Sequence, residues 1–146
     1  MKLSSILGLN ARNQLYSYRF NTKKGRKICD SKILTERFLK KVDIPVPNIY
    51  KVFRKPQDVF DFNWDSLSSS FALKPSRGMG GEGIIVIKKR ANPETSGWIT
   101  TQRNTVGVND LKLHTLDILE GAYSMGNEPD VAFIQEYVGR HKAFRK

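Results

Sequence analysis

The stretch FALKPSRGMGGEGIIVIKK, residues 71–89, constrains the fold more than any other part of the chain. Two apolar runs flank a loop with four glycines, and they predict strands at 71–75 and 83–89. Glycine permits positive φ angles and lets the main chain approach a ligand closely. The N–H groups of such a loop can bind phosphate oxygens. A flexible hairpin without a ligand is the alternative interpretation.

Lys74 lies next to the end of the first of these strands, just before the loop. A lysine is rarely placed inward on an apolar strand without a partner, which favours a negatively charged ligand. The order of residues excludes two common phosphate loops. A P-loop ends in Gly-Lys-Ser/Thr directly before a helix, whereas here the glycines follow the lysine and lead into a strand. A dinucleotide-binding loop is excluded because these glycines open no helix.

The remaining pattern is helical first and then mainly β. SKILTERFLKKV predicts a helix that Asp30 or Ser31 caps. Residues 1–29 predict a short helix and then an extended segment, with KKGRK as a solvated loop. Further predictions are a strand at 49–53, a short helix after Pro56, a strand at 97–102, a helix after Asn109 and a last strand in VAFIQEYV.

These elements predict the α+β class: a mainly helical part, then a small antiparallel sheet with a packed helix. DSLSSS has the composition of a linker. It suggests two subdomains, residues 1–65 and 66–146.

Glu136 lies near the end of the last predicted strand, in FIQEYV. A carboxylate on an apolar strand is unfavourable unless it meets a hydrogen-bond donor. A purine base would supply one through its exocyclic amine, while its ring lies against Tyr137 and Val138. A solvated glutamate on a half-exposed strand is the alternative.

Charge favours an anionic partner. Lys and Arg number 25 and Asp and Glu number 14, so the net charge is +11. This attracts nucleotide phosphates, nucleic acid or an anionic membrane surface, and the charge alone does not choose among them. The basic residues are scattered and no nucleic-acid-binding motif is visible, which favours a nucleotide. No apolar run reaches the roughly 20 residues of a membrane span, and the single cysteine fits a reducing compartment. We therefore expect a cytoplasmic protein with no membrane partner.

Taken together, DSKILTERFLKKVDIPVP, FALKPSRGMGGEGIIVI and FIQEYV resemble the lysine helix, glycine-rich lid and adenine hinge of an ATP-grasp domain. Within that superfamily the chain is similar to the alpha-L-glutamate ligase-related, sugar-transfer-associated type over nearly all 146 residues. The fold implied is the N-terminal part of an ATP-grasp protein, which ends in the lid subdomain.

The resemblance implies a role in ATP binding for fourteen residues. Lys32 and Lys74 would be the two phosphate-binding lysines, and the lid over the β- and γ-phosphates would be formed by Ser76, Arg77, Gly78, Met79, Gly80, Gly81, Glu82 and Gly83. Adenine would be held by Glu136 and by the backbone of Tyr137 and Val138, with Gln135 beside them in the ATP site.

The implied reaction joins a carboxylate to an amine through an acylphosphate, with ATP and Mg²⁺. We assign no catalytic residue and no metal ligand, because the family's magnesium ligands are expected downstream of residue 146. We therefore expect a nucleotide-binding part that is inactive alone, whose uncovered cleft face favours self-association. A non-catalytic basic domain that binds nucleotides or nucleic acid is the alternative.

Overall fold

A computed structural model describes residues 7–67, 70–78, 80–91, 97–139, 141 and 143. The chain divides into two compact units, Met1–Ile44 and Pro45–Lys146. The predicted subdomain boundary near residue 66 falls within the second unit and stays a prediction.

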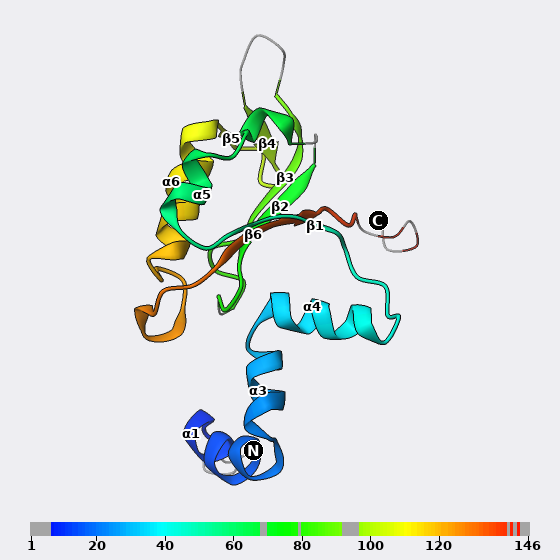
Figure 1. The fold of residues 1–146 in the computed structure, drawn as a ribbon, viewed down its shortest axis with the longest axis vertical. Coiled ribbons are helices and arrows are strands. Elements are labelled where there is room, and N and C mark those ends of the chain that lie inside the picture. The colour runs from blue at the N-terminus through cyan, green and yellow to red at the C-terminus, as the bar shows by residue number, and fades with distance from the viewer. Residues whose placement is uncertain are drawn as a thin grey trace. The chain divides into compact units, whose positions relative to one another are not determined.

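The first unit is helical, as predicted. It contains α1 (Leu9–Arg12), the π-helix η2 (Asn13–Ser17), α2 (Tyr18–Phe20), α3 (Lys23–Cys29) and α4 (Lys32–Lys41), drawn in blue to cyan in Figure 1. The Ser31 hydroxyl oxygen accepts a 3.3 Å hydrogen bond from the N–H of Leu34, which confirms the predicted N-cap of α4.

The extended segment predicted before residue 29 is wrong, and KKGRK lies in α3 rather than in a loop. Thr22 caps this helix, because its hydroxyl oxygen accepts a 3.0 Å hydrogen bond from the N–H of Gly25. Lysine and arginine are good helix formers, and the cap and these residues outweigh the roughly 1 kcal/mol that a glycine costs inside a helix.

The second unit is built on a six-stranded antiparallel sheet with the order β1-β6-β2-β3-β4-β5 (Figure 1). Its strands are β1 (Ile49–Phe53), β2 (Phe71–Pro75), β3 (Ile85–Arg90), β4 (Trp98–Thr100), β5 (Thr105–Val106) and β6 (Ala132–Glu136). β2 has the predicted bounds. The two-residue strand β5 was not predicted, since it is too short to show any alternation.

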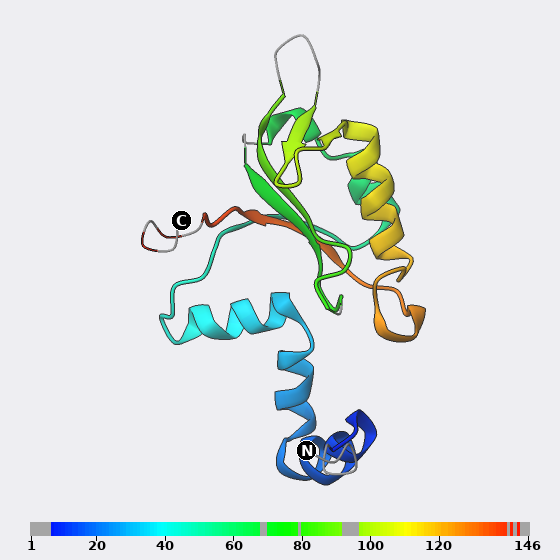
Figure 2. The same cartoon turned by 180° about the vertical axis from the view of Figure 1, so that it is seen from behind.

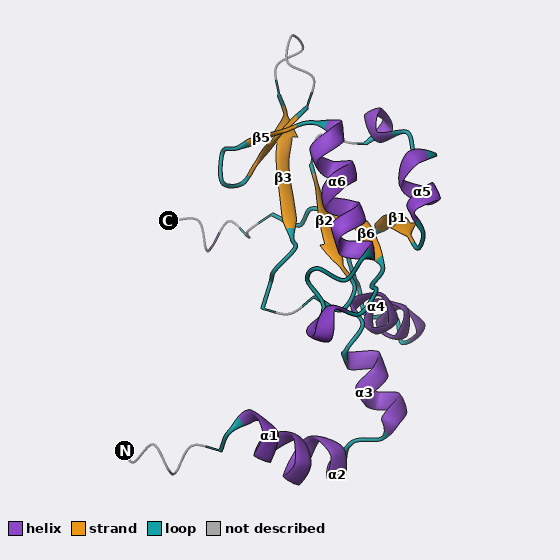
Figure 3. Ribbon diagram, turned by 90° about the vertical axis from the view of Figure 1, so that its left-hand side faces the viewer, coloured by secondary structure: helices purple, strands orange, loops and turns teal. Residues whose placement is uncertain are grey.

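Helices cover one face of this sheet. They are α5 (Pro56–Phe60), α6 (Val108–Leu119) and the 3₁₀ turn η3 (Trp64–Ser66). A further 3₁₀ turn, η4 (Met125–Asn127), lies between α6 and β6 in the chain and has no buried residue. α5 and α6 lie side by side (Figure 2), and a quarter turn shows α6 running beside β2 and β3 (Figure 3). Leu111 and Ile118 of α6 pack with Phe71, Leu73 and other buried side chains of the strands in one core. This arrangement confirms the α+β class.

The position of β1 could not be deduced from its own residues. The sequence predicted a strand at 49–53 but assigned it to the helical part of the chain. In the structure Phe53 lies opposite Ala132, so β1 pairs with β6 at the edge of the sheet. The ring of Phe53 is fully buried and stacks on Trp64 at 5.4 Å between centroids. Burial of this ring fixes β1 in the second unit.

Candidate functional site

Lys74 lies on the face of the sheet that points away from α6. Successive side chains of a strand point to opposite faces. Phe71 and Leu73 face the core, so Ala72 and Lys74 face the other way. The strand register pairs Ala72 with both Val86 of β3 and Gln135 of β6, which places these side chains on the same face as Lys74.

A hollow of about 210 Å³ opens on this face. It is lined by Pro47, Ala72, Lys74, Val86, Gln135, Glu136, Tyr137 and Val138. Five of these residues, Lys74 and 135–138, are among those predicted to bind ATP. Binding sites for whole small molecules usually measure about 300–1,000 Å³. The hollow therefore suits one part of a ligand, such as a flat heterocyclic base.

Lys74 and Gln135 form the polar centre of the hollow. The Lys74 ammonium donates a 2.6 Å hydrogen bond to the side-chain oxygen of Gln135. Lys74 is half-buried and Gln135 is almost fully buried. A hydrogen bond to a charged group is short and strong in such surroundings, so the pair holds the positive charge at one place on the sheet.

Glu136 has a partner that the sequence did not indicate. Its Oε2 atom accepts hydrogen bonds from the backbone N–H and the side-chain amide of Asn48, both at 3.0 Å. The backbone N–H of Glu136 donates in return to the Asn48 carbonyl at 2.8 Å. These three bonds fasten the segment before β1 to the end of β6. The donor that Glu136 was expected to need is supplied by the protein in this structure.

The glycine-rich loop, residues 76–83, connects β2 to β3. Ser76 is buried, whereas Arg77 and Glu82 are exposed. A side chain at Gly78 would collide with the ring of Pro75. Met79 lies outside the described residues.

Three glycines of this loop have positive φ, namely Gly80 at 62°, Gly81 at 84° and Gly83 at 69°. A Cβ atom at Gly80 or Gly81 would meet nothing within 4 Å. At Gly83 it would lie 2.5 Å from Cγ of Tyr123. All three glycines thus have a left-handed backbone, and of the three only Gly83 also lies where a side chain would collide with a neighbour.

Lys32 is the first residue of α4 and belongs to the first unit. Ser31 directly before it caps the helix. The predicted role of Lys32 as a phosphate-binding lysine stays a prediction.

A magnesium site does not form among the described residues. They contain no group of three or more His, Cys, Asp or Glu side chains that could hold a metal ion. Magnesium needs several oxygen ligands in near-octahedral geometry. The polar residues that line the hollow are Lys74, Gln135, Glu136 and Tyr137, and the one carboxylate among them is bound to Asn48, so this set does not fit the ion.

The prediction from sequence did not include several residues that lie around the site. Ala72 and Val86 alternate with their strand neighbours, and that periodicity could have placed them on the face of Lys74. Asn48 gave no such signal, since it meets Glu136 across 88 residues of chain. His114 on α6 likewise gave no such signal, since its Nε2 atom meets the Gly83 carbonyl oxygen across 31 residues of chain.

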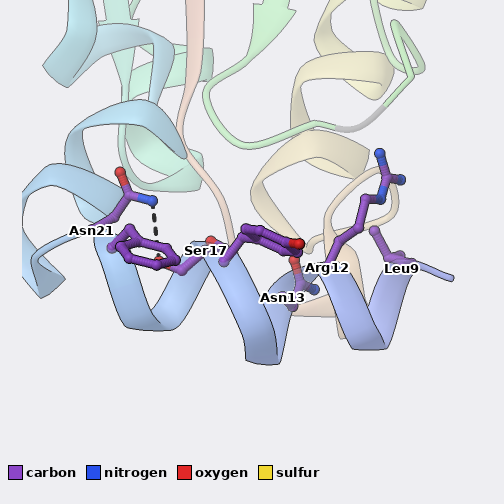
Figure 4. Close-up of a pocket in the computed structure, with 7 residues that line it drawn as sticks. Leu9, Arg12, Asn13, Ser17 and Asn21 are labelled. Carbon is purple, nitrogen blue, oxygen red and sulfur yellow. Dashed lines mark hydrogen bonds between the residues drawn. The ribbon is translucent and has the colours of Figure 1, made fainter. Parts of the chain in front are cut away.

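A second hollow, of about 570 Å³, lies in the first unit along α1, η2 and α2 (Figure 4). It is lined by Leu9, Arg12, Asn13, Tyr16, Ser17, Phe20 and Asn21. Leu9 and Phe20 are 59% and 70% exposed. Asn21 donates a 3.1 Å hydrogen bond to the Ser17 carbonyl. None of the residues predicted to bind ATP lines this hollow.

In the part of the chain that the structure describes, the helices lack the length and apolar character needed to cross a membrane.

The antiparallel sheet, its packed helices and the glycine-rich hairpin beside a lysine-lined hollow define an α+β protein with a candidate nucleotide site. The chain belongs to the sugar-transfer associated ATP-grasp family, whose sequence model matches residues 11–146. This match confirms the resemblance seen in the sequence. Comparison with curated proteins and with solved structures found no match.

Proposed function

We propose that the hollow on β2 and β6 binds the adenine of ATP and that the glycine-rich loop contacts its phosphates. The observation that carries the proposal is the gathering of Lys74 and residues 135–138 in one hollow. They come from β2 and from the end of β6 with the two residues after it. Lys74 and Gln135 are 61 residues apart in the chain, and the fold brings them together. Membership of the ATP-grasp family supports ATP as the ligand.

The geometry suggests how the nucleotide lies. The base would sit in the hollow against Ala72 and Val86, with the backbone of Tyr137 and Val138 along its edge. Lys74 is two residues from Ser76, where the glycine-rich loop begins. A phosphate chain that runs from the hollow toward the loop would therefore pass the Lys74 ammonium. Gln135 holds that charge on the correct face of the sheet.

We further propose that this binding serves the ligation of a carboxylate to an amine. A carboxylate oxygen would attack the γ-phosphorus of ATP, forming an acylphosphate as the bond to ADP breaks. The amine nitrogen would then attack the acyl carbon, releasing phosphate and a proton and leaving an amide. Family membership implies Mg²⁺ as well as ATP, and the described residues supply no ligand set for the ion. The described residues contribute nucleotide positioning and the charge of Lys74, and the acid and the amine are unknown.

Titration of ATP into the purified protein by calorimetry tests the proposal. We expect the wild type to bind, and Lys74→Ala to bind at least about tenfold more weakly, because a charge-assisted hydrogen bond contributes about 1.5–3 kcal/mol. Lys88→Ala is the matched control, since Lys88 is an exposed lysine on the neighbouring strand β3 and its loss changes the net charge equally.

Two outcomes would contradict the proposal. One is a wild type that binds no ATP with or without Mg²⁺. The other is equal weakening by Lys74→Ala and Lys88→Ala, which would indicate unspecific attraction to the net charge of +11. A single-stranded oligonucleotide titrated in parallel at two salt concentrations identifies that case, because unspecific binding falls steeply with salt.

A further inference from the structure

Two residues outside the predicted site, Asp130 and Val131, hold the first end of the glycine-rich loop. The backbone N–H of Ser76 donates to the Val131 carbonyl at 2.8 Å, and that of Arg77 donates to Oδ2 of Asp130 at 2.6 Å. The other oxygen of Asp130 accepts from the N–H of Val131 at 2.7 Å. Asp130 is only 7% exposed. A buried carboxylate that accepts two backbone hydrogen bonds has a fixed orientation, so it fixes the peptide at Arg77 as well.

A second anchor holds the far end of the loop. Nε2 of His114 lies 2.8 Å from the Gly83 carbonyl oxygen, and the Tyr123 hydroxyl lies 3.2 Å from Nδ1. A carbonyl oxygen can only accept, so Nε2 donates to it and, in the neutral imidazole, Nδ1 accepts from the tyrosine. The two rings pack at 5.1 Å between centroids. Tyr123 also covers Gly83, where a Cβ atom would meet its ring.

The described tip of the loop, Gly80 and Gly81, is not packed against neighbouring side chains as the two ends are. Gly80 and Gly81 have positive φ and open space where a side chain would be. Backbone N–H groups in such a turn can form a concave binding site for an anion. The direction of these N–H groups depends on where the two ends of the loop are held, because a Cβ atom at Gly80 or Gly81 would meet no neighbouring atom.

We propose that His114 and Asp130 are positioning residues for the phosphates of the nucleotide. They fix Gly83 and Arg77, and thereby orient the N–H groups of Gly80 and Gly81, which lie between them, toward the phosphate chain. Neither side chain touches the nucleotide in this proposal. The inference rests on the proposed function, since it assigns a role in binding ATP at the same site.

The test compares ATP with adenosine, which has the same base and ribose without phosphates. We expect His114→Ala to weaken ATP binding about fivefold, the effect of one lost hydrogen bond, and to leave adenosine binding unchanged. Leu113→Ala is the control on the same helix, because Leu113 is 62% exposed. His114→Gln retains an N–H donor and should recover part of the affinity. Where His114→Ala does not fold, Tyr123→Phe replaces it, since it removes only the hydroxyl bond.

Asp130→Asn gives a second test. If Asp130 acts through its charge, this variant should bind ATP more tightly, and if it acts by positioning the loop, the variant should bind ATP more weakly. Loss of a negative charge near phosphates favours tighter ATP binding. Loss of one of the two carboxylate oxygens that hold Arg77 and Val131 favours weaker ATP binding, again by about fivefold. Glu128→Gln is the control, because it removes the same charge from an exposed position two residues away. Tighter binding by both variants, or equal losses for ATP and adenosine, would overturn the proposal.

Amide hydrogen exchange without nucleotide separates this inference from the proposed function. We expect faster exchange in the peptide spanning 76–84 for His114→Ala and Asp130→Asn than for the wild type, with little change in β6. If the wild type bound no ATP, the proposed function would be wrong even with this exchange pattern. If it bound ATP but loop exchange in both variants equalled that of the wild type, the anchors would be wrong and the proposed function would stand.

Discussion

The Lys74 ammonium donates a 2.6 Å hydrogen bond to the side-chain oxygen of Gln135, joining β2 to β6 on the face of the sheet away from the packed helices. The two residues are diagonal neighbours, because Gln135 lies directly opposite Ala72. Long side chains reach across such a diagonal. The pair places one positive charge beside an otherwise largely apolar hollow, and it is the chemical centre of the candidate site.

A double-mutant cycle should measure this relationship. We expect Lys74→Met and Gln135→Leu to show a coupling of about 1–3 kcal/mol in the free energy of unfolding, because the bond is charge-assisted and half-buried. Urea unfolding of the four proteins supplies the values. Lys88→Met combined with Gln135→Leu should be additive within about 0.5 kcal/mol. Additivity of the Lys74 pair as well would mean that the bond contributes nothing in solution.

We expect the main role of the Glu136 side chain to be structural, namely to hold Asn48 in the segment that precedes β1. Glu136→Ala removes the acceptor of two Asn48 hydrogen bonds and should lower the free energy of unfolding by about 1–2 kcal/mol. Asn48→Ala removes only the side-chain bond and should cost about half as much. Thermal or urea unfolding compares the two. A Glu136→Ala protein as stable as the wild type, with weakened adenosine binding, would instead assign the carboxylate to the base.

Gly83 and Gly81 should respond differently to the same substitution. Both have positive φ, so alanine costs about 1–2 kcal/mol at either position. At Gly83 the new methyl group also meets Tyr123, whereas at Gly81 it enters open space. We therefore expect Gly83→Ala to be the more destabilising change, by about 1–3 kcal/mol. Equal melting temperatures of the two variants would show that Tyr123 does not pack against the loop in solution.

Tyr123 should make the stability of the protein fall at high pH. Burial raises the pKa of its hydroxyl above the ordinary value of 10.0, and the charge of Asp117 adds to the effect. The contribution is complete below pH 10. It is lost as the pH rises toward the folded-state pKa, because the unfolded chain releases this proton first. The stability of the wild type relative to Tyr123→Phe, measured by urea unfolding between pH 8 and 11, should decrease above about pH 10. A stability difference between the wild type and Tyr123→Phe that does not change with pH would contradict this prediction.

Local signals in the sequence located many of the elements. The apolar run at 71–75 predicted β2, Ser31 predicted the start of α4, and Pro56 predicted α5, since each signal acts within a few residues. The N-terminal helices were underestimated. There Gly25 and the lysine run suggested a loop, and the cap supplied by Thr22 was overlooked.

The sequence by itself determined the family, the lysine strand and the glycine-rich loop, because residue type and order within short segments carry them. Only the tertiary structure decided the partners: Gln135 for Lys74, Asn48 for Glu136, and His114 for Gly83. These pairs span 61, 88 and 31 residues. They depend on the insertion of β6 between β1 and β2 and on the packing of α6 against the sheet. Strand order and register are set by burial of the whole core, which no local pattern of residues encodes.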